Sequence, residues 1–307
     1  DIKGVSALYS FSSFTFTNAG QTGRLGPTLV TLTGHADYSS TEWNMNDTTL
    51  FQLGEDGNTS TRDGYQLWTV PTDGTYKIIA KGASGGSSGS SNNHGYGGKI
   101  EAHFVLTKGT KLLIIIGQMG LTTGSTGGAG GGGGASWVLK PVASGGYSAI
   151  SNLYMVAGGG AGGMSSEHGA GTTRAPSAAL VTSGATTGGN AGANYNGGGG
   201  AGYTTDGGGG SQNSFGRRVG AGAVGGESST EQNYAGAGQD GGFGGGGAGQ
   251  HHEAGSGAGY KGGSTPGYTQ YNSDGYGRSF VSTTASYTGA HSTPALLTDG
   301  SVYIELL

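Results

Sequence analysis

Short runs in which apolar and polar residues alternate mark both ends of the chain, and they predict β-strands. Near the end of the chain, Val302, Ile304 and Leu306 share one face, because successive side chains of a strand point to opposite faces. Phe14 and Phe16 share a face in the same way near its start. The predicted strands cover residues 14–17, 29–32, 48–53, 65–70, 75–82, 99–107, 110–117, 136–140, 153–157, 277–282 and 300–307.

Helices are expected to be almost absent. Residues 174–183 are one candidate, which Pro176 would keep short, and residues 41–46 are a candidate for a single helical turn. Lys108 and Gly109 lie between two of the predicted strands, a pattern that indicates a hairpin. The expected fold class is therefore mainly β.

A glycine-rich block, residues 82–263, separates the two strand-rich ends. The protein has 73 glycines among 307 residues, against about 7% in an average protein. Runs of consecutive glycines form neither helix nor strand by propensity, because glycine loses more backbone entropy on ordering than any other residue. The longest runs lie in residues 127–136, 196–203, 206–211 and 241–250.

This block has two interpretations. One is a loop-rich or flexible tract. The other is a bundle of polyglycine II helices, which are left-handed, have three residues per turn and contain no internal hydrogen bonds. Side by side, such helices would satisfy one another's backbone groups, and close packing would leave no room for Cβ atoms. A collagen helix is excluded, since the sequence has no sustained Gly-X-Y period and only 6 prolines.

The simplest organisation is an antiparallel β-sandwich with the glycine-rich bundle inserted into it. Residues 1–13 would be an N-terminal arm. Residues 14–123 and 264–307 would form the sandwich, and residues 124–263 the bundle with its short strands.

Composition narrows the classes of function that this protein can have. The protein has 14 basic and 18 acidic residues, a net charge of −4, which argues against nucleic-acid binding. No stretch approaches the ~18 apolar residues of a membrane-spanning helix. Cysteine is absent, so disulfides and thiolate metal sites are excluded. Asn46 and Asn58 begin glycosylation sequons, which fit an extracellular, secreted protein.

Catalytic and metal-binding motifs are weak. Ser84 and Ser87 each stand in a G-x-S-x-G pattern, but a nucleophile elbow needs a following helix, and none is predicted. The sequence His251-His252-Glu253 is the best metal candidate, although adjacent side chains of an extended segment point apart. We therefore expect no enzyme activity, no metal and no cofactor.

Two features are candidates for contact with a partner. Arg217 and Arg218 would suit an anion or a partner protein, or they would be an exposed loop pair. Tyrosines scattered through the glycine-rich block would form a contact surface or cap the rim of the bundle. They are Tyr195, Tyr203, Tyr234, Tyr260, Tyr268 and Tyr271.

From residue 14 to residue 307, the sequence resembles the extracellular glycine-rich region of the anaplastic lymphoma kinase and leukocyte tyrosine kinase receptors. The motifs that carry this resemblance are FTFTNAG, GYQLWTVPTDGTYKI, LLIIIGQMG, GGAGGGGGASWVLK, LYMVAGGGAGG and STPALLTDGSVYIELL. The resemblance implies a TNF-like β-sandwich that carries a polyglycine-helix bundle and binds small protein ligands. The region in that family has cysteines, which this protein lacks.

Two functions are expected from these features. The first is a secreted, non-enzymatic structural protein whose copies associate into an extracellular fibre or surface coat. The alternative is a ligand-binding or adhesive ectodomain similar to those receptors, with a protein or glycan as its ligand.

The N-terminal arm is the candidate subunit contact. Val5, Ala7, Tyr9 and Phe11 alternate with other residues and would share one face of an edge strand. Such a strand would add to a sheet of a neighbouring copy. In the other arrangement, the arm folds back onto its own sandwich.

Overall fold

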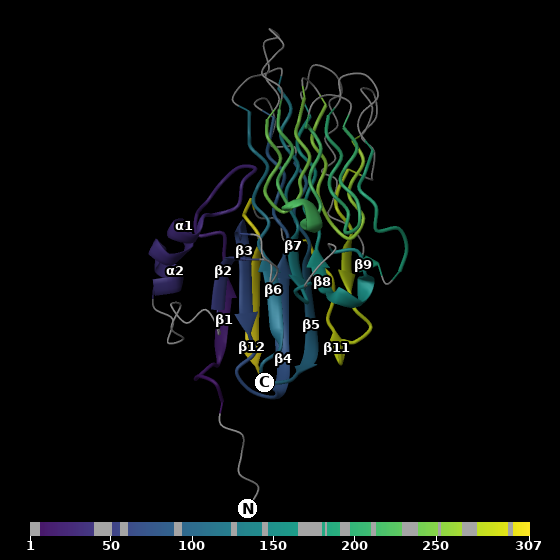
Figure 1. The fold of residues 1–307 in the computed structure, drawn as a ribbon. Coiled ribbons are helices and arrows are strands. Elements are labelled where there is room, and N and C mark those ends of the chain that lie inside the picture. Colours follow the sequence, from purple (N-terminus) through teal and green to yellow (C-terminus); the bar gives the residue numbers. More distant parts are fainter. Residues whose placement is uncertain are drawn as a thin grey trace, which may run out of the picture.

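The protein forms a mainly β structure with two sheets and few helices (Figure 1). The computed structural model describes residues 7–39, 51–55, 61–88, 94–123, 128–142, 147–164, 180–181, 183–190, 197–209, 213–228, 239–250, 253–265, 275–293 and 297–307. For residues 39, 51–55 and 61–62 it describes the backbone alone.

The first sheet contains strands from both ends of the sequence. Its strand order is β1-β12-β4-β5-β11, and neighbouring strands are antiparallel. The alternation predicted for the last strand is confirmed, since Val302 and Ile304 are fully buried. The bounds are β1 Ser13–Phe16, β4 Gly74–Lys81, β5 Lys99–Leu106, β11 Tyr287–Thr288 and β12 Ser301–Leu306.

The second sheet has the order β2-β3-β6-β7-β8-β10-β9. Its neighbouring strands are antiparallel except β9 and β10, which are parallel. The bounds are β2 Phe51–Glu55, β3 Thr61–Thr69, β6 Lys111–Ile115, β7 Ser136–Leu139, β8 Leu153–Ala157, β9 Leu180–Val181 and β10 Ser279–Val281. The helices are α1 Leu29–Gly34, α2 Ala36–Ser39, and the 3₁₀ turns η1 Ile150–Asn152 and η3 Val219–Ala221.

The predicted hairpin around Lys108 and Gly109 is wrong. β5 lies in the first sheet and β6 in the second, so this turn crosses from one sheet to the other. Backbone bonds of Val70 hold the corner, since its N–H donates to Thr110 O and its carbonyl accepts from Gly109 N–H. Both strands bury apolar faces in the same core, so their patterns do not reveal which sheet each one joins.

Two other predictions are corrected. Residues 29–34 form α1 rather than a strand, because the Thr28 side chain accepts a hydrogen bond from Thr31 N–H and caps the helix. Leu180 and Val181 form β9, so the helix predicted for residues 174–183 is wrong at these two positions. The remaining residues of that range, apart from 183, and the turn predicted at 41–46 lie outside the described part of the protein.

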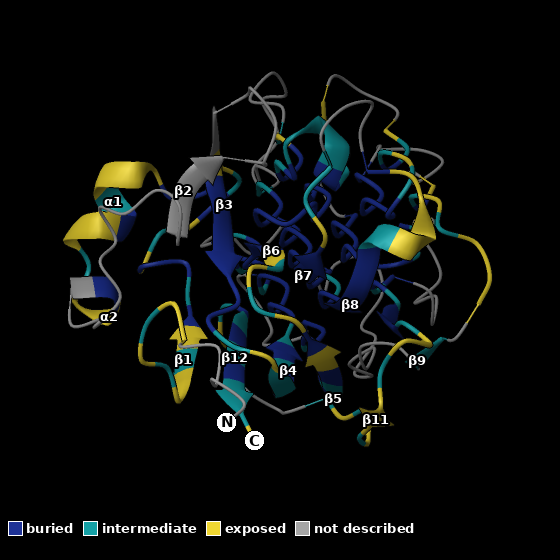
Figure 2. Ribbon diagram, turned by 60° about the horizontal axis from the view of Figure 1, so that its bottom comes forward, coloured by how far each residue is buried: buried dark blue, intermediate teal, exposed yellow. Residues whose placement is uncertain are grey.

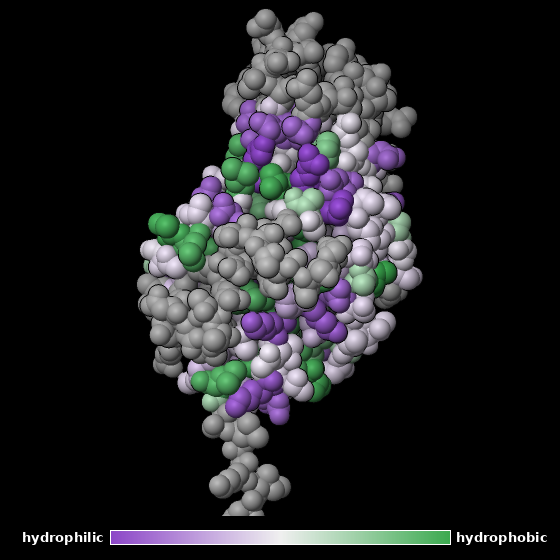
Figure 3. Space-filling view, viewed as in Figure 1, coloured by the Kyte–Doolittle hydropathy of each residue, from purple (hydrophilic) through white to green (hydrophobic). Residues whose placement is uncertain are grey.

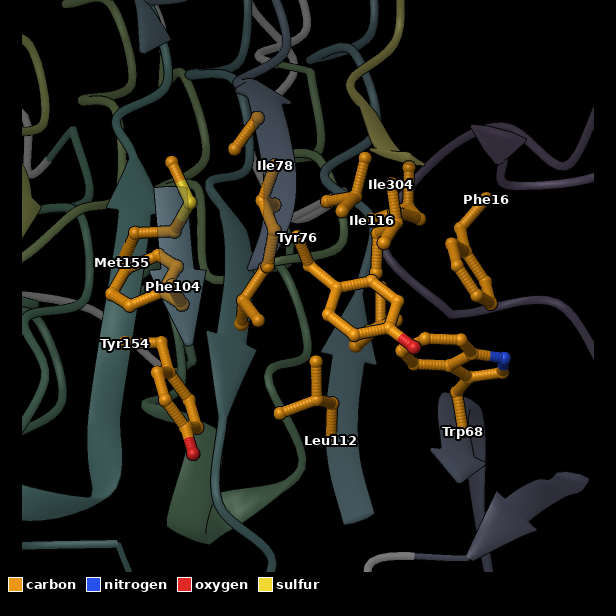
Figure 4. Packing of buried hydrophobic residues seen from close by; sticks show 14 of the residues in the cluster. Phe16, Trp68, Tyr76, Ile78, Phe104, Leu112, Ile116, Tyr154, Met155 and Ile304 are labelled. Carbon is orange, nitrogen blue, oxygen red and sulfur yellow. The ribbon is translucent and has the colours of Figure 1, made fainter. Parts of the chain in front are cut away.

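The main core lies between the two sheets (Figure 4). Aromatic rings of Phe16, Trp68 and Tyr76 pack beside Ile78 and Leu112, and all five residues are fully buried. This core draws residues from both sheets, which is the packing expected of a β-sandwich.

A second core lies on the other side of the second sheet. Trp137 and Val156 face residues from the glycine-rich block there, including Tyr203, Phe243 and Tyr260. The central strands β6, β7 and β8 of the second sheet are thus buried on both faces. The glycine-rich block contributes aromatic residues to a core of its own rather than only leaning on the sandwich.

The glycine segments run side by side beyond the sandwich (Figure 1), and they are largely buried (Figure 2). We call these segments, residues 82–88, 94–98, 117–123, 128–135, 158–164, 188–190, 197–209, 213–228, 239–250, 253–265 and 275–278, the glycine layer. Backbone N–H groups hold it together, and their direction repeats every three residues. Gly130 and Gly133 donate to one neighbouring segment, Gly131 and Gly134 to a second, and Gly132 and Ala135 to a third.

The same three-residue repeat occurs elsewhere in the layer. Residues 198 and 201, 199 and 202, and 200 and 203 form three such pairs, each donating to its own neighbouring segment. Residues 82–86 follow the rule as well, so the layer begins directly after β4, earlier in the sequence than residue 124.

Close approach of the backbones explains the glycine content. A Cβ atom added to Gly132 would lie 2.1 Å from the carbonyl oxygen of Ser256, and one on Gly199 would lie 2.1 Å from that of Gly189. These distances are far below van der Waals contact. The layer therefore excludes any side chain at such positions.

Candidate functional site

The described part of the N-terminal arm packs against its own sandwich. The Phe11 ring lies 5.0 Å from that of Trp68 and 6.3 Å from that of Tyr76. The Tyr9 hydroxyl donates to Thr69 O, and burial raises the pKa of this phenol, which keeps it a neutral donor. Ala7 is exposed. The geometry of Tyr9 and Phe11 is that of an arm folded back on its own sandwich, and an intersubunit contact stays a prediction.

Several candidate residues lie outside the described part of the protein. They are Val5, Asn46, Asn58, His251 and His252. Glu253 is fully buried in the glycine layer, where its Oε2 accepts a hydrogen bond from Gly197 N–H at 3.1 Å. Among the described residues, no three His, Cys, Asp or Glu side chains gather in a way that could hold a metal ion.

The two G-x-S-x-G serines occupy an extended segment. Ser84 is buried, and its backbone N–H donates to Thr298 O at 3.1 Å. Ser87 N–H donates to the Thr122 hydroxyl at 3.1 Å. Both serines lie in the glycine layer after β4, with no helix following in the described residues, so neither has the strand–turn–helix setting of a nucleophile elbow.

Two of the six candidate tyrosines are described, and neither belongs to a contact surface. Tyr203 and Tyr260 are buried in the second core. Tyr195, Tyr234, Tyr268 and Tyr271 lie outside the described residues.

Arg217 lines a pocket at the junction of the glycine layer and the sandwich, and Arg218 follows it directly in the sequence. The pocket has a volume of about 380 Å³. It lies beside η3, the short green coil in Figure 1. Its walls include two cationic, one amide and three apolar side chains. These are Arg24, Arg217, Asn213, Phe215, Ala221 and Val224.

Backbone hydrogen bonds fix the frame of this pocket. Gly225 N–H donates to Arg24 O at 2.9 Å, which joins the segment before α1 to the glycine layer. Arg217 N–H donates to Val224 O at 2.8 Å and closes the loop that contains η3. The Tyr65 hydroxyl donates to Val219 O and anchors the loop to β3. Three parts of the sequence that lie far apart are thus joined around the pocket.

Neighbouring side chains hold the guanidinium groups of Arg217 and Arg24 in place. The Arg217 guanidinium lies 4.3 Å from the centre of the Phe215 ring, a cation–π geometry. Its Nη1 donates to Asp206 Oδ2 at 3.2 Å, and its Nη2 donates to Asn213 Oδ1 at 3.2 Å. Arg24 is paired with Glu227.

Charge around the pocket is positive. Arg218 Nη1 lies 3.6 Å from Asp206 Oδ1, so this carboxylate is shared by two guanidinium groups. Three arginines, residues 24, 217 and 218, therefore face two carboxylates, those of Asp206 and Glu227. The local balance is +1 on a protein whose net charge is −4.

The sequence suggested Arg217 and Arg218 as a contact, but it did not suggest Arg24 or the apolar walls. Along the part of the protein that the structure describes, no helix is long and apolar enough to cross a membrane.

Comparison with known proteins gives a distant point of reference. No family model matches the sequence. The leukocyte tyrosine kinase receptor of Mus musculus is 33% identical over 106 residues, which are 34% of this protein and 11% of the receptor. The protein is thus distantly similar to a small part of that receptor.

Proposed function

We propose that this protein is a non-enzymatic extracellular binding module that holds a protein partner on a rigid surface. The observation that carries this proposal is the pocket at the junction of layer and sandwich. There, Arg24 and Arg217 line a cavity of about 380 Å³ together with apolar side chains. Pockets that combine apolar walls with a few placed polar groups are typical binding sites.

Similarity to a receptor supports the same proposal. One matching relative is by name a receptor, and binding a ligand is the role that this similarity suggests here. The TNF-like form of the sandwich, which the resemblance implies, belongs to this proposal, as does an extracellular location.

We also infer that the glycine layer is a bundle of polyglycine II helices. Its N–H groups turn through three directions and repeat every third residue, as they would on a helix with three residues per turn. A layer bonded in three directions would resist bending. Such preorganisation favours binding, because fewer groups must be ordered when the partner arrives.

A position-specific cross-linking experiment tests the binding role. A photoreactive amino acid would replace Ala221 at the pocket in one variant and exposed Val105 on β5 in a second. Both variants would be incubated with native extracellular fluid and irradiated. We expect one protein partner to be cross-linked from position 221 and not from position 105. Equal or absent capture at the two positions would contradict a binding role for this pocket.

Self-association into a fibre or surface coat is the second candidate function. Its basis is the N-terminal arm, which in the structure docks on its own sandwich through Tyr9 and Phe11, so assembly would require the arm to exchange onto a second copy. An arm that docks on its own sandwich could dock in the same way on a second copy, and exchange in one direction would propagate. Electron microscopy of purified native protein separates the two functions: monodisperse particles support the binding module, and filaments support the structural protein.

A further inference from the structure

We propose that the pocket beside η3 receives the C-terminal residue of a partner protein, with its carboxylate on the arginines and an apolar side chain on the walls. This inference rests on the proposed binding function and gives the partner's chemistry.

The cationic part of the pocket is preorganised. Phe215 supports one face of the Arg217 guanidinium, while Asp206 and Asn213 each accept one of its hydrogen bonds. A guanidinium has five N–H donors in a planar fork, so donors remain for a further acceptor. A carboxylate is the acceptor whose geometry matches that fork.

The charge balance favours a singly charged guest. One carboxylate added to the pocket would neutralise the local balance of +1 left by Arg24, Arg217 and Arg218 with their two acidic partners. A phosphate group, with a charge near −2, would exceed it. Glu227 is half exposed, so its pairing with Arg24 can yield to the guest at little cost.

The apolar walls favour a guest that carries an apolar group as well as a charge. Phe215, Ala221 and Val224 line the pocket together with its polar groups. A volume of about 380 Å³ is near the lower limit for ligand pockets, about 300 Å³, and suits a single residue. The C-terminal residue of a polypeptide can carry a carboxylate and an apolar side chain together, whereas an internal Asp or Glu supplies only the carboxylate.

The surrounding surface fits a polypeptide. Leu25, which follows Arg24, and Leu29 and Val30 on α1 are exposed, with Val30 at 80%. Figure 3 shows an apolar patch at α1 and hydrophilic patches nearby on this face of the molecule. Because Leu25 directly follows the pocket residue Arg24, the residues that precede a bound C-terminus would find an apolar contact there.

Three small organic probes and inorganic phosphate, each added to the whole protein, test the proposal by NMR. N-acetyl-phenylalanine mimics the C-terminal residue, N-acetyl-phenylalanine amide lacks its charge, and N-acetyl-glutamate amide lacks the aromatic group. We expect the free acid to shift the guanidinium N–H signals of Arg24 and Arg217. It should bind about tenfold more tightly than either other organic probe, because charge-assisted hydrogen bonds and apolar burial act together.

Matched variants locate the effect. Arg217→Gln and Arg24→Gln should each weaken binding of the free acid at least about fivefold by removing a charge-assisted donor. Lys111→Gln is the control, since Lys111 is exposed on β6, does not line the pocket, and loses the same unit of charge. Backbone amide spectra would establish that each variant is folded.

Four results would overturn the proposal. They are no binding of the free acid, equal binding of its amide, tighter binding of N-acetyl-glutamate amide or inorganic phosphate, and equal weakening by Lys111→Gln. If the free acid binds as expected while cross-linking from position 221 fails, the pocket chemistry stands and the proposed function fails. If cross-linking from position 221 succeeds but the free acid does not bind, the proposed function stands and the proposed recognition of a C-terminal residue fails.

Discussion

The rings of Tyr260 and Phe280 stack in parallel, with centroids 4.3 Å apart and planes inclined by 6°. Tyr260 belongs to the glycine layer, whereas Phe280 lies in β10 of the second sheet. The pair joins the two parts of the molecule through apolar contact rather than through backbone hydrogen bonds alone. We therefore expect layer and sandwich to unfold together.

This pair gives the first prediction. Tyr260→Ala should lower the free energy of unfolding by about 3–5 kcal/mol, because it removes a buried ring and leaves a cavity. Tyr260→Phe keeps the ring and is the control. Denaturant unfolding, followed by tryptophan fluorescence and by far-ultraviolet circular dichroism, provides the measurement. Two separate transitions in the unmodified protein would show that layer and sandwich unfold independently.

Substitutions of glycine test the packing of the layer. Gly199→Val should prevent folding or cost at least about 3 kcal/mol, because the new Cβ would meet the Gly189 carbonyl oxygen at 2.1 Å. Gly34→Val is the matched control, since nothing lies within 4 Å of a Cβ at that position. Soluble yield and melting temperature are compared. Unchanged melting of the Gly199 variant would mean that this backbone contact is not formed.

Deletion of residues 1–10 tests the arm. The truncated protein should remain a folded monomer, since Phe11 keeps its place beside Trp68. Its stability should fall by about 1 kcal/mol from the lost hydrogen bond between the Tyr9 hydroxyl and Thr69 O. If the arm links copies, the truncated protein no longer assembles. Light scattering would measure this, and fibres formed without the arm, or failure to fold, would refute the intersubunit role.

His291 gives a pH prediction. Its Nε2 lies 3.2 Å from the Ser279 hydroxyl, and burial lowers its pKa below the usual value. The unfolded protein, with a histidine pKa of about 6.5, binds the proton more readily than the folded one. The contribution of His291 is therefore complete above about pH 6.5 and is lost as the pH falls through the folded pKa.

A variant isolates this histidine from the other six. His291→Gln keeps a polar partner for Ser279 but does not titrate. Unfolding free energies at neutral pH and at pH values below the usual histidine pKa are compared for both proteins. The unmodified protein should lose more stability on acidification than the variant, and equal losses would show that His291 is not the group responsible.

Glycosylation tests the extracellular location. Asn46 and Asn58 begin sequons, and we expect both to carry glycans when the protein is made in a cell that adds them. Intact mass before and after glycosidase treatment measures this, with Asn46→Gln and Asn58→Gln as single-site controls. An unchanged mass would remove this support for secretion.

The strand pattern was predictable because it depends on local spacing. Alternation in residues 75–82 and 300–307 led to β4 and β12, which pair with each other through Ile78 and Ile304. Leu29 and Val30 were misassigned, since a short apolar run fits a strand or a helix, and the cap on Thr28 decided for the helix. The alternating pattern also could not show with which strands residues 99–106 and 111–115 pair.

The pocket was largely hidden from the sequence. Arg24 and Arg217 line one cavity because Gly225 N–H bonds to Arg24 O, a contact between segments far apart in the sequence. Phe215 next to Arg217 was visible as a neighbour, but its stacking under the guanidinium required the loop geometry. No spacing rule links these residues.

By itself, the sequence determined the local properties of this protein: β-strands at both ends, glycine at almost every position of the central runs, and the absence of cysteine chemistry. These properties follow from side-chain alternation and from the lack of a Cβ, which act within a few residues. The tertiary structure decided which sheet each strand joins, which segments the glycines contact, and where Arg24 meets Arg217. Those outcomes depend on hydrogen bonds and packing between distant segments, which only the complete fold brings together.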